Sequence, residues 1–271
     1  MMLQESDFAS NIARFTGFAG LYDESRPHPP PVLLDLLTQL AGVATPSLVV
    51  DLGCGTGLSS RFWSARARQV IGVEPTDDMR HQAKLRTAAA NVSYLSGFSH
   101  RSGLPDNCAD IVTCSQSLHW MDPLPTFKEV ARVLRRGGDF AAYDCDFPPT
   151  TSSWKADAAY VRFMERVAEL EEDYNVSDGL QRWSKAEHLN RMKASGCFRF
   201  TKEVVLHHVE DGNAKRLITL TRSQGNVATL FKKGLSERDL GMDEFRAIAN
   251  ETLGANANPW YFSTKVRLGI V

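Results

Sequence analysis

The chain has 271 residues, of which 43% are hydrophobic and 23% are charged, and its formal net charge is −1. These proportions are typical of a globular protein with one large domain or with a core and an added cap. The near-neutral charge argues against a nucleic-acid partner, because nucleic-acid binding relies on an excess of lysine and arginine. No apolar run approaches the ~20 residues that span a bilayer, so we also expect no membrane partner.

Particular residue types narrow the class of protein further. The first seven residues lack the basic-then-apolar order of a signal peptide, which favours a cytoplasmic protein. The five cysteines form no C-x-x-C pair, and their odd number argues against a disulfide framework. The seven histidines show none of the usual metal-ligand spacings, so no metal site is predicted. No feature of the sequence specifies an oligomeric state.

Two helices are predicted near the start of the chain. Apolar residues recur at spacings of three and four between Phe8 and Tyr22, as on one face of a helix. A second amphipathic pattern covers residues 32–40 and follows three consecutive prolines, which can begin a helix. Between the two patterns, residues 22–27 read Tyr-Asp-Glu-Ser-Arg-Pro.

The stretch from residue 48 to residue 67 predicts a strand, a glycine turn and a helix. Residues 48–50 form an apolar run that Asp51 ends, and Gly53, Gly55 and Gly57 then alternate. This order of elements is found at nucleotide sites in open α/β sheets. Glycines let the backbone turn sharply and approach a ligand closely, and the start of the following helix presents free N–H groups.

Four further strands are predicted over residues 69–73, 92–95, 109–114 and 140–144. Glu74 follows the first of these and lies 17 residues after Gly57. This separation is close to the ~20 residues at which an acidic side chain binds a ribose in dinucleotide folds. Because a carboxylate can accept hydrogen bonds from two neighbouring hydroxyl groups, Glu74 is predicted to bind a ribose.

Residues 51–57, Asp-Leu-Gly-Cys-Gly-Thr-Gly, fit neither the G-x-G-x-x-G fingerprint nor a P-loop. As a unit they resemble motif I of the class I S-adenosylmethionine (SAM)-dependent methyltransferases. Residues 115–123 resemble a segment of the subgroup that includes trans-aconitate methyltransferase-like proteins, also called methyltransferase type 11. The predicted helix that begins at residue 127 and ends in Arg-Arg-Gly-Gly resembles another landmark of the family. The resemblance is specific over residues 45–147.

The resemblance implies an α/β fold with a Rossmann-like, seven-stranded, mostly parallel sheet and helices on both faces. An antiparallel strand at the C-terminal edge and an inserted helical cap are also implied. The chain would form a single domain over 1–271. Its parts would be an N-terminal lid and first helix (1–45), a SAM-binding core (46–147), a helical cap (148–197), and C-terminal strands with a helical insertion (198–271). The candidate pocket residues of the cap are Tyr160, Arg162, Tyr174, Asn175 and Trp183.

The resemblance also implies SAM as the cofactor. Tyr22 and Arg26 would belong to a lid, Pro75, Met79, Phe98 and Ser99 would lie near the adenine, and Ser115 and Gln116 near the methionyl group. Many relatives carry an acidic residue where Phe98 and Ser99 stand here. The predicted cofactor-binding residues are Tyr22, Arg26, Asp51, Gly53, Gly55, Gly57, Glu74, Pro75, Met79, Phe98, Ser99, Ser115 and Gln116.

The implied reaction is in-line transfer of the SAM methyl group to an oxygen or nitrogen of a small molecule, with carboxylates among the acceptors. His119 is the first candidate for a catalytic base, and Tyr22 or Tyr174 could orient the substrate. Two alternatives stay open. The chain could consume SAM by another route and release methylthioadenosine, for example by cyclising the aminocarboxypropyl group. It could also bind SAM without catalysis.

Overall fold

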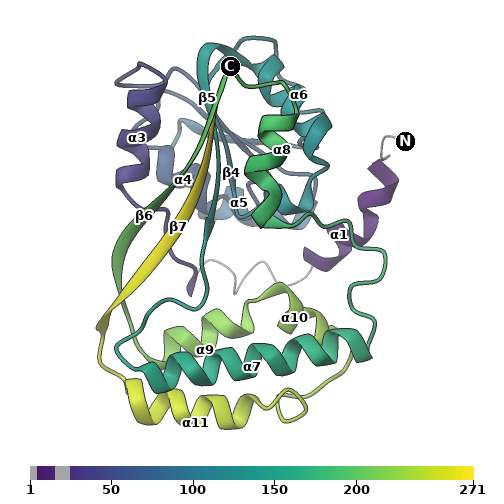
Figure 1. Ribbon diagram of the computed structural model, residues 1–271, viewed down its shortest axis with the longest axis vertical. Helices are drawn as coiled ribbons and strands as arrows, with labels where there is room; N and C mark the ends of the chain where they lie inside the picture. Colours follow the sequence, from purple (N-terminus) through teal and green to yellow (C-terminus); the bar gives the residue numbers. More distant parts are fainter. Residues whose placement is uncertain (1–4, 16–24) are drawn as a thin grey trace.

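The computed structural model describes residues 5–15 and 25–271 (Figure 1). Within these residues the strands form one seven-stranded sheet of order β3-β2-β1-β4-β5-β7-β6. The first five pair in parallel, whereas β7 is antiparallel to both β5 and β6. The predicted fold class is therefore confirmed. The strands are β1 (Val49–Leu52), β2 (Val70–Val73), β3 (Val92–Leu95), β4 (Ala109–Ser115), β5 (Leu134–Cys145), β6 (Phe200–Gly212) and β7 (Asn258–Ile270).

Helices cover both faces of this sheet because its central strands are apolar on both sides. On one face, α3 (Val32–Leu40) and α4 (Leu58–Trp63) share a buried cluster with Val49 of β1. On the other face, α6 (Pro123–Val133) and α8 (His188–Ala194) pack around Val50. A further helix, α5 (Asp77–Arg86), buries Ala83 against Tyr94 of β3.

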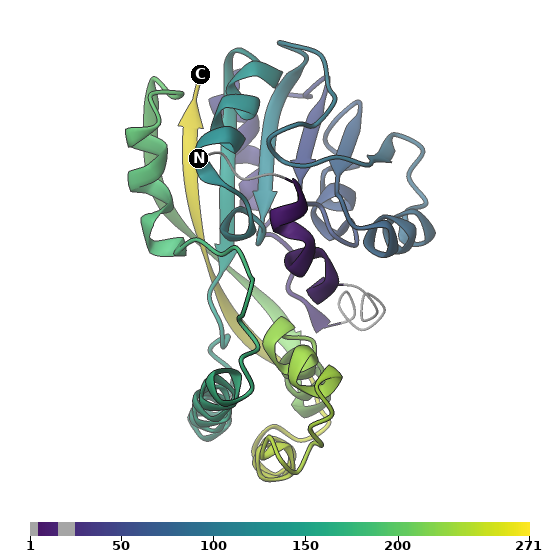
Figure 2. The same ribbon diagram turned by 90° about the vertical axis from the view of Figure 1, so that its right-hand side faces the viewer.

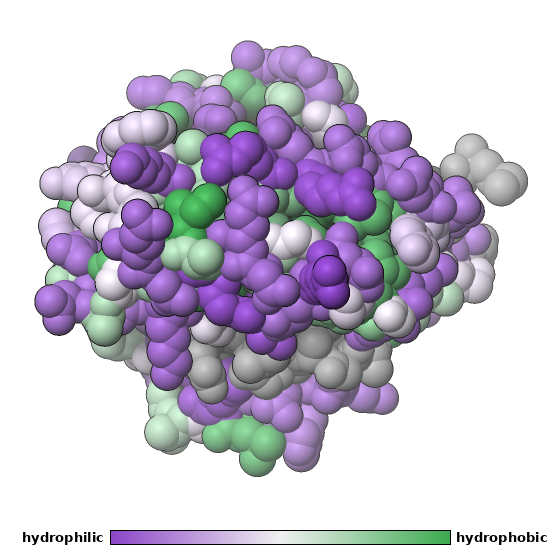
Figure 3. Space-filling view, turned by 90° about the horizontal axis from the view of Figure 1, so that it is seen from below, coloured by the Kyte–Doolittle hydropathy of each residue, from purple (hydrophilic) through white to green (hydrophobic). Residues whose placement is uncertain are grey.

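A second lobe is mainly helical (Figures 1 and 2). It contains α7 (Trp154–Asp173), α9 (Ala214–Arg222), α10 (Gly225–Lys232) and α11 (Met242–Leu253). The long strands β6 and β7 reach this lobe, and β7 contributes Trp260 and Phe262 to its core. Seen from below, the molecule shows mostly hydrophilic residues with small, separate apolar groups (Figure 3). The four helices therefore turn their apolar faces mainly toward one another.

The helical lobe does not follow the boundaries that the sequence suggested. It takes α7 from the predicted cap at 148–197, and α9, α10 and α11 from the predicted C-terminal part at 198–271. In contrast, α8 packs against α6 beside the sheet. The inserted helices thus come from two separate places in the chain and meet in one lobe.

Several predicted element ends were wrong. Asp51 does not end the first strand but lies inside β1, where it pairs with Gly72 and Thr113. The helix expected to end at Arg135–Gly138 stops at Val133, because Leu134 already pairs with Ala109 of β4. Helix α7 continues through the acidic residues 171–173, because glutamate is a good helix former.

The N-terminal segment lies in front of the lower part of the sheet and above the helical lobe in Figure 2. Its elements are the 3₁₀ turn η1 (Glu5–Phe8) and helix α1 (Ala9–Phe15). The Asn11 side chain donates to the Gln181 carbonyl at 2.8 Å and accepts from the Gln181 N–H at 2.9 Å. Helix α1 is thereby fixed to the segment that leaves the lobe. Within residues 5–15 and 25–271, no helix has the length and apolar character needed to cross a bilayer.

Candidate active site

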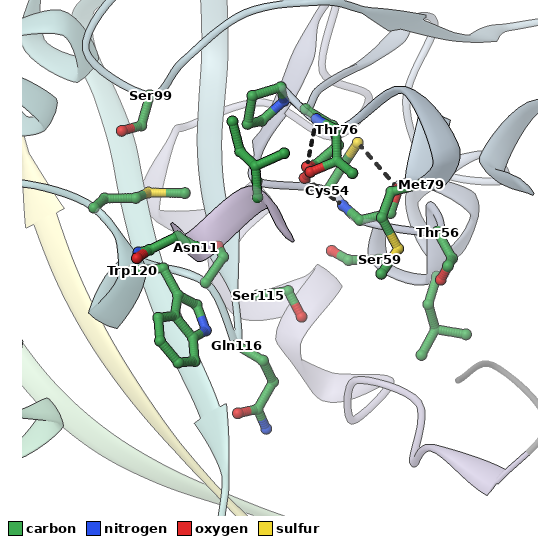
Figure 4. A pocket seen from close by; sticks show the side chains of 18 of the residues that line it. Asn11, Cys54, Thr56, Ser59, Thr76, Met79, Ser99, Ser115, Gln116 and Trp120 are labelled. Carbon is green, nitrogen blue, oxygen red and sulfur yellow. Dashed lines mark hydrogen bonds between the residues drawn. The ribbon is translucent and has the colours of Figure 1, made fainter. Parts of the chain in front are cut away.

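A large cavity opens at the carboxyl ends of β1, β2 and β4, where open α/β sheets bind their ligands. Its empty volume, counted to the open mouth, is about 1260 Å³. Thr56, Thr76 and Met79 gather on one side of this space, and Asn11, Gln116 and Trp120 on the other (Figure 4). The predicted site residues that line it are Arg26, Gly53, Gly55, Glu74, Pro75, Met79, Phe98, Ser99, Ser115 and Gln116.

The first two glycines of the turn border the cavity, and each needs a positive φ. Gly53 has φ of +63°, and a Cβ there would lie 2.9 Å from the Ser117 Cβ. Gly55 has φ of +55°, and a Cβ there would meet no atom within 4 Å. The backbone at Gly55 therefore faces open space, as a turn that cradles a ligand requires.

The third glycine does not line the cavity. Gly57 occupies the N-cap position of α4 with φ of +81°. A Cβ on Gly57 would overlap the hydroxyl oxygen of Tyr94 and lie 2.8 Å from its Cζ. The positive φ and the close packing against Tyr94 explain why a glycine stands at position 57. The sequence had suggested that Gly57 contacts a cofactor.

Glu74 is held at the end of β2 by two backbone N–H groups. Its Oε2 accepts from the Gly55 N–H at 3.1 Å, and its Oε1 accepts from the Thr76 N–H at 3.0 Å. Burial raises the pKa of Glu74, while these hydrogen bonds oppose the rise. A carboxylate has about four acceptor positions, so two remain for a ligand. The side chain is thus oriented before any ligand binds.

Asp51 lies beneath the turn and does not line the cavity. Its carboxylate accepts from the Ser60 hydroxyl at 2.7 Å and from the Thr113 hydroxyl at 3.0 Å. It is fully buried and ties β1 to α4 and β4. Burial raises the pKa of Asp51 to about 6. Asp51 therefore supports the glycine turn from below and does not contact the cavity.

We expect Asp51→Asn to change how stability depends on pH. Between the ordinary pKa of 3.8 and the folded value of about 6, the folded chain retains a proton that the unfolded chain releases. Wild-type stability therefore falls as pH rises across this window, by up to about 3 kcal/mol from this carboxyl. Urea unfolding of both proteins without cofactor, at about pH 4 and about pH 7, measures the effect. The variant should gain stability relative to wild type at the higher pH, and an unchanged difference would contradict the expectation.

At the other side of the cavity, the Gln116 side chain is fixed at both ends. Its Nε2 donates to the Cys145 carbonyl at 3.3 Å, and its Oε1 accepts from the Lys185 ammonium at 3.0 Å. Lys185 lies 2.8 Å from a carboxylate oxygen of Asp144, which also pairs with Arg267 at 2.7 Å. The amide of Gln116 therefore presents a fixed polar edge to the cavity.

The third border of the cavity combines aromatic and hydroxyl groups. The ring of Phe98 lies 6.3 Å from that of Phe8 and 5.5 Å from that of His100. The Ser99 hydroxyl pairs with that of Thr126 at 2.8 Å. Sequence reasoning did not assign to the site the lining residues Phe8, Asn11, Cys54, Thr56, Ser59, Thr76, Trp120, Met121 and Phe147. Most of these residues follow the end of a strand or belong to the N-terminal segment. Their position in the chain is the feature from which they could have been predicted.

The predicted catalytic residues are not brought together at the cavity. His119 is buried outside it, with Nδ1 3.9 Å from an Asp144 oxygen. Burial, aided by the charge of Lys185, lowers the pKa of His119 well below its ordinary value. In the 3₁₀ turn Leu118–Trp120, successive side chains point about 120° apart, so Trp120 lines the cavity in place of His119. Tyr174 is exposed at the end of α7, and Tyr22 lies outside the described residues.

The candidate pocket residues of the predicted cap do not line this cavity either. Tyr160 is buried in the core of the helical lobe and packs against Phe245. Trp183 stacks on Phe8 at 6.4 Å and so lies behind a lining residue. Arg162 and Asn175 also lie outside the lining.

Comparison with known proteins relates this site to a family. Residues 50–142 match a family described as "Methyltransferase domain". The chain is 37% identical over 124 residues to an uncharacterized methyltransferase of Mycobacterium bovis, covering 46% of this chain and 49% of that one. It is 36% identical over 94 residues to malonyl-[acyl-carrier protein] O-methyltransferase of Pectobacterium atrosepticum, covering 34% and 36%. The chain thus spans about half the length, or less, of these relatives.

Solved structures show the same fold over most of the chain. A candidate type II methyltransferase from Anaeromyxobacter dehalogenans has a TM-score of 0.65 and 21% identity, over 90% of this chain and 97% of that one. A candidate methyltransferase from an antibiotic biosynthesis pathway of Anabaena variabilis has a TM-score of 0.55 and 19% identity, over 87% and 97%. At these identities the likeness concerns the fold alone.

Proposed function

We propose that the chain transfers the methyl group of SAM to an oxygen or nitrogen of a small molecule, because residues 50–142 match a family described as "Methyltransferase domain". The observation that carries the proposal is the carboxylate of Glu74, which two backbone N–H groups hold beside an open glycine turn. Its two remaining acceptor positions fit the two hydroxyl groups of a ribose.

The residues around Glu74 fit the rest of the nucleoside. Pro75, Met79 and Phe98 offer apolar surface for the adenine, and the Ser99 hydroxyl offers a polar contact. Ser115 and Gln116 would face the methionyl part, and Arg26 also lines the cavity.

When bound, SAM supplies a methyl group on a positively charged sulfur that leaves as a neutral thioether. The task of the chain is to hold the acceptor atom in line with the methyl–sulfur bond, about 3 Å from the carbon. Trp120, Met121 and Phe147 line the acceptor side and would exclude water from that approach. Gln116 would orient the acceptor through its fixed amide.

A carboxylate oxygen is the acceptor that this arrangement favours. A carboxylate is already ionised at neutral pH and needs no base, which agrees with the burial of His119 outside the cavity. A curated relative named as an O-methyltransferase supports oxygen as the accepting atom. The narrower likeness to trans-aconitate methyltransferase-like proteins stays a prediction.

Calorimetric titration of the purified chain with SAM tests the cofactor assignment. We expect one SAM per chain, and S-adenosylhomocysteine should compete for the same site. No binding of either nucleoside to folded protein would overturn the proposal. The same titration at two salt concentrations would show whether the contacts are mainly hydrogen bonds, because screened charge pairs weaken with salt.

A further inference from the structure

We propose that Arg14 and Arg182, which lie over the indole ring of Trp120, bind an anionic group of the acceptor, a carboxylate or a phosphate. This inference rests on the proposed function and names the chemical class of its substrate. The guanidinium carbon of Arg14 lies 5.7 Å from the Trp120 ring centroid, and that of Arg182 lies 5.5 Å from it. Trp120 itself lines the cavity.

Arg14 is a buried cation with unused hydrogen-bond donors. Only 7% of the residue is exposed, and its Nη2 lies 3.3 Å from a Glu171 oxygen. Its Nε and Nη1 are buried without a hydrogen-bond partner among the described residues. Buried donors are almost always paired in proteins, so the two nitrogen atoms call for an acceptor. A carboxylate or phosphate matches a guanidinium group in charge and in geometry.

Two neighbours hold the Arg14 side chain in place. Gly225, at the start of α10, faces this arginine, and a Cβ there would lie only 3.3 Å from its Nε. The Nε edge thus packs closely against Gly225, and a larger residue there would crowd the guanidinium group. Glu171 is shared with Asn226, whose amide donates to the other carboxylate oxygen at 3.2 Å. Glu171 therefore cannot turn to satisfy the remaining donors of Arg14.

The second arginine, Arg182, directly follows Gln181. Two hydrogen bonds between the Asn11 side chain and the Gln181 backbone fix the position of this part of the chain. Arg182 is exposed, and no carboxylate pairs with its side chain among the described residues. Its positive charge acts against that of Arg14, as the lowered pKa of Arg14 reflects, with burial the larger cause. Glu171 offsets the charge of Arg14, whereas no carboxylate among the described residues offsets that of Arg182.

The site lies away from the predicted ribose contact and from Met79. Trp120 and Asn11 lie on the opposite side of the cavity from Thr76 and Met79 (Figure 4). An acceptor held by its anionic group at Trp120 would extend across the cavity toward Ser115 and Gln116. The two arginines would then select acceptors by charge and leave the reacting atom free.

Calorimetry on protein saturated with S-adenosylhomocysteine tests this inference, because the carboxylate of the nucleoside then already occupies its own place. The probes are citrate, glutarate and inorganic phosphate, with glutaramide as the uncharged control. We expect at least one anion to bind and glutaramide not to bind. Arg14→Met should lower the affinity for that anion about tenfold or more. Arg182→Met should weaken it as well, while nucleoside affinity stays unchanged.

Arg136→Met is the matched control, since Arg136 is exposed near the opposite end of β5. Should Arg14→Met not fold, the comparison of Arg182→Met with this control decides the question. No anion binding to the loaded wild type would overturn the inference, and so would equal affinity in all variants. Binding that occurs only without nucleoside would assign the arginines to the SAM carboxylate and also overturn it. Failure of the nucleoside itself to bind would instead refute the proposed function.

Discussion

Glu74→Ala is expected to weaken SAM binding by roughly tenfold or more, which corresponds to about 1.4 kcal/mol. The variant loses the carboxylate positions that face the ligand, and it also releases the N–H groups of Gly55 and Thr76. Both changes weaken the contact with the ribose. The glycine turn would be less ordered, and no carboxylate would accept hydrogen bonds from the ribose hydroxyl groups. Titration calorimetry of the variant and the wild type with SAM measures the loss.

The control for this variant is Asp77→Ala. Asp77 stands three residues later in the first turn of α5, and its side chain is 94% exposed. Its removal changes the net charge by the same amount but should leave SAM affinity within about twofold, because exposed ion pairs contribute little. Equal losses in the two variants would mean that general charge, and not the position of Glu74, governs binding.

Gly57→Ala is expected to cost about 2–5 kcal/mol of folding stability. Left-handed backbone costs a non-glycine residue roughly 1–2 kcal/mol, and overpacking against a buried ring adds about 1–3 kcal/mol. The φ of +81° and the overlap with Tyr94 supply these two causes. Chemical denaturation without SAM measures the loss, and a stability equal to that of wild type would contradict this reading of the glycine.

The neighbouring variant Gly55→Ala separates packing from binding. The Cβ that this substitution adds would meet no protein atom within 4 Å, so only the backbone cost of about 1–2 kcal/mol should appear in stability. The added methyl group would instead occupy space beside the ligand, and SAM affinity should fall. We therefore expect Gly57→Ala to lose more stability and Gly55→Ala to lose more affinity. The reverse order would contradict the assigned roles.

Local patterns allowed the sheet and the cofactor side to be predicted from the sequence. The sequences at β1, β2 and β4 are short and mostly apolar, as strands covered on both faces require. Glu74 was identifiable because its offset from the glycine turn follows from the geometry of one strand, one helix and one strand. The structure confirms the fold, and it places Glu74 on the cavity wall.

The acceptor side could not be predicted in the same way, because it depends on contacts between distant parts of the chain. Arg14 reaches Glu171 and the Trp120 ring across more than one hundred residues, and no spacing in the sequence reveals this. Whether His119 or Trp120 faces the cavity depends on the direction of a 3₁₀ turn, and this direction cannot be read from the sequence motif. Helices of the second lobe likewise meet only in the folded chain.

The most direct test of methyl transfer uses SAM labelled with deuterium on its methyl group. The purified chain is incubated with this SAM and a metabolite extract enriched in small carboxylates, and the products are analysed by mass spectrometry. Methyl transfer predicts S-adenosylhomocysteine and an equal amount of an acceptor that carries the labelled methyl group, both above a protein-free control. Methylthioadenosine accumulating above that control, without a labelled acceptor, would contradict the account, because SAM would then be cleaved on the other side of its sulfur.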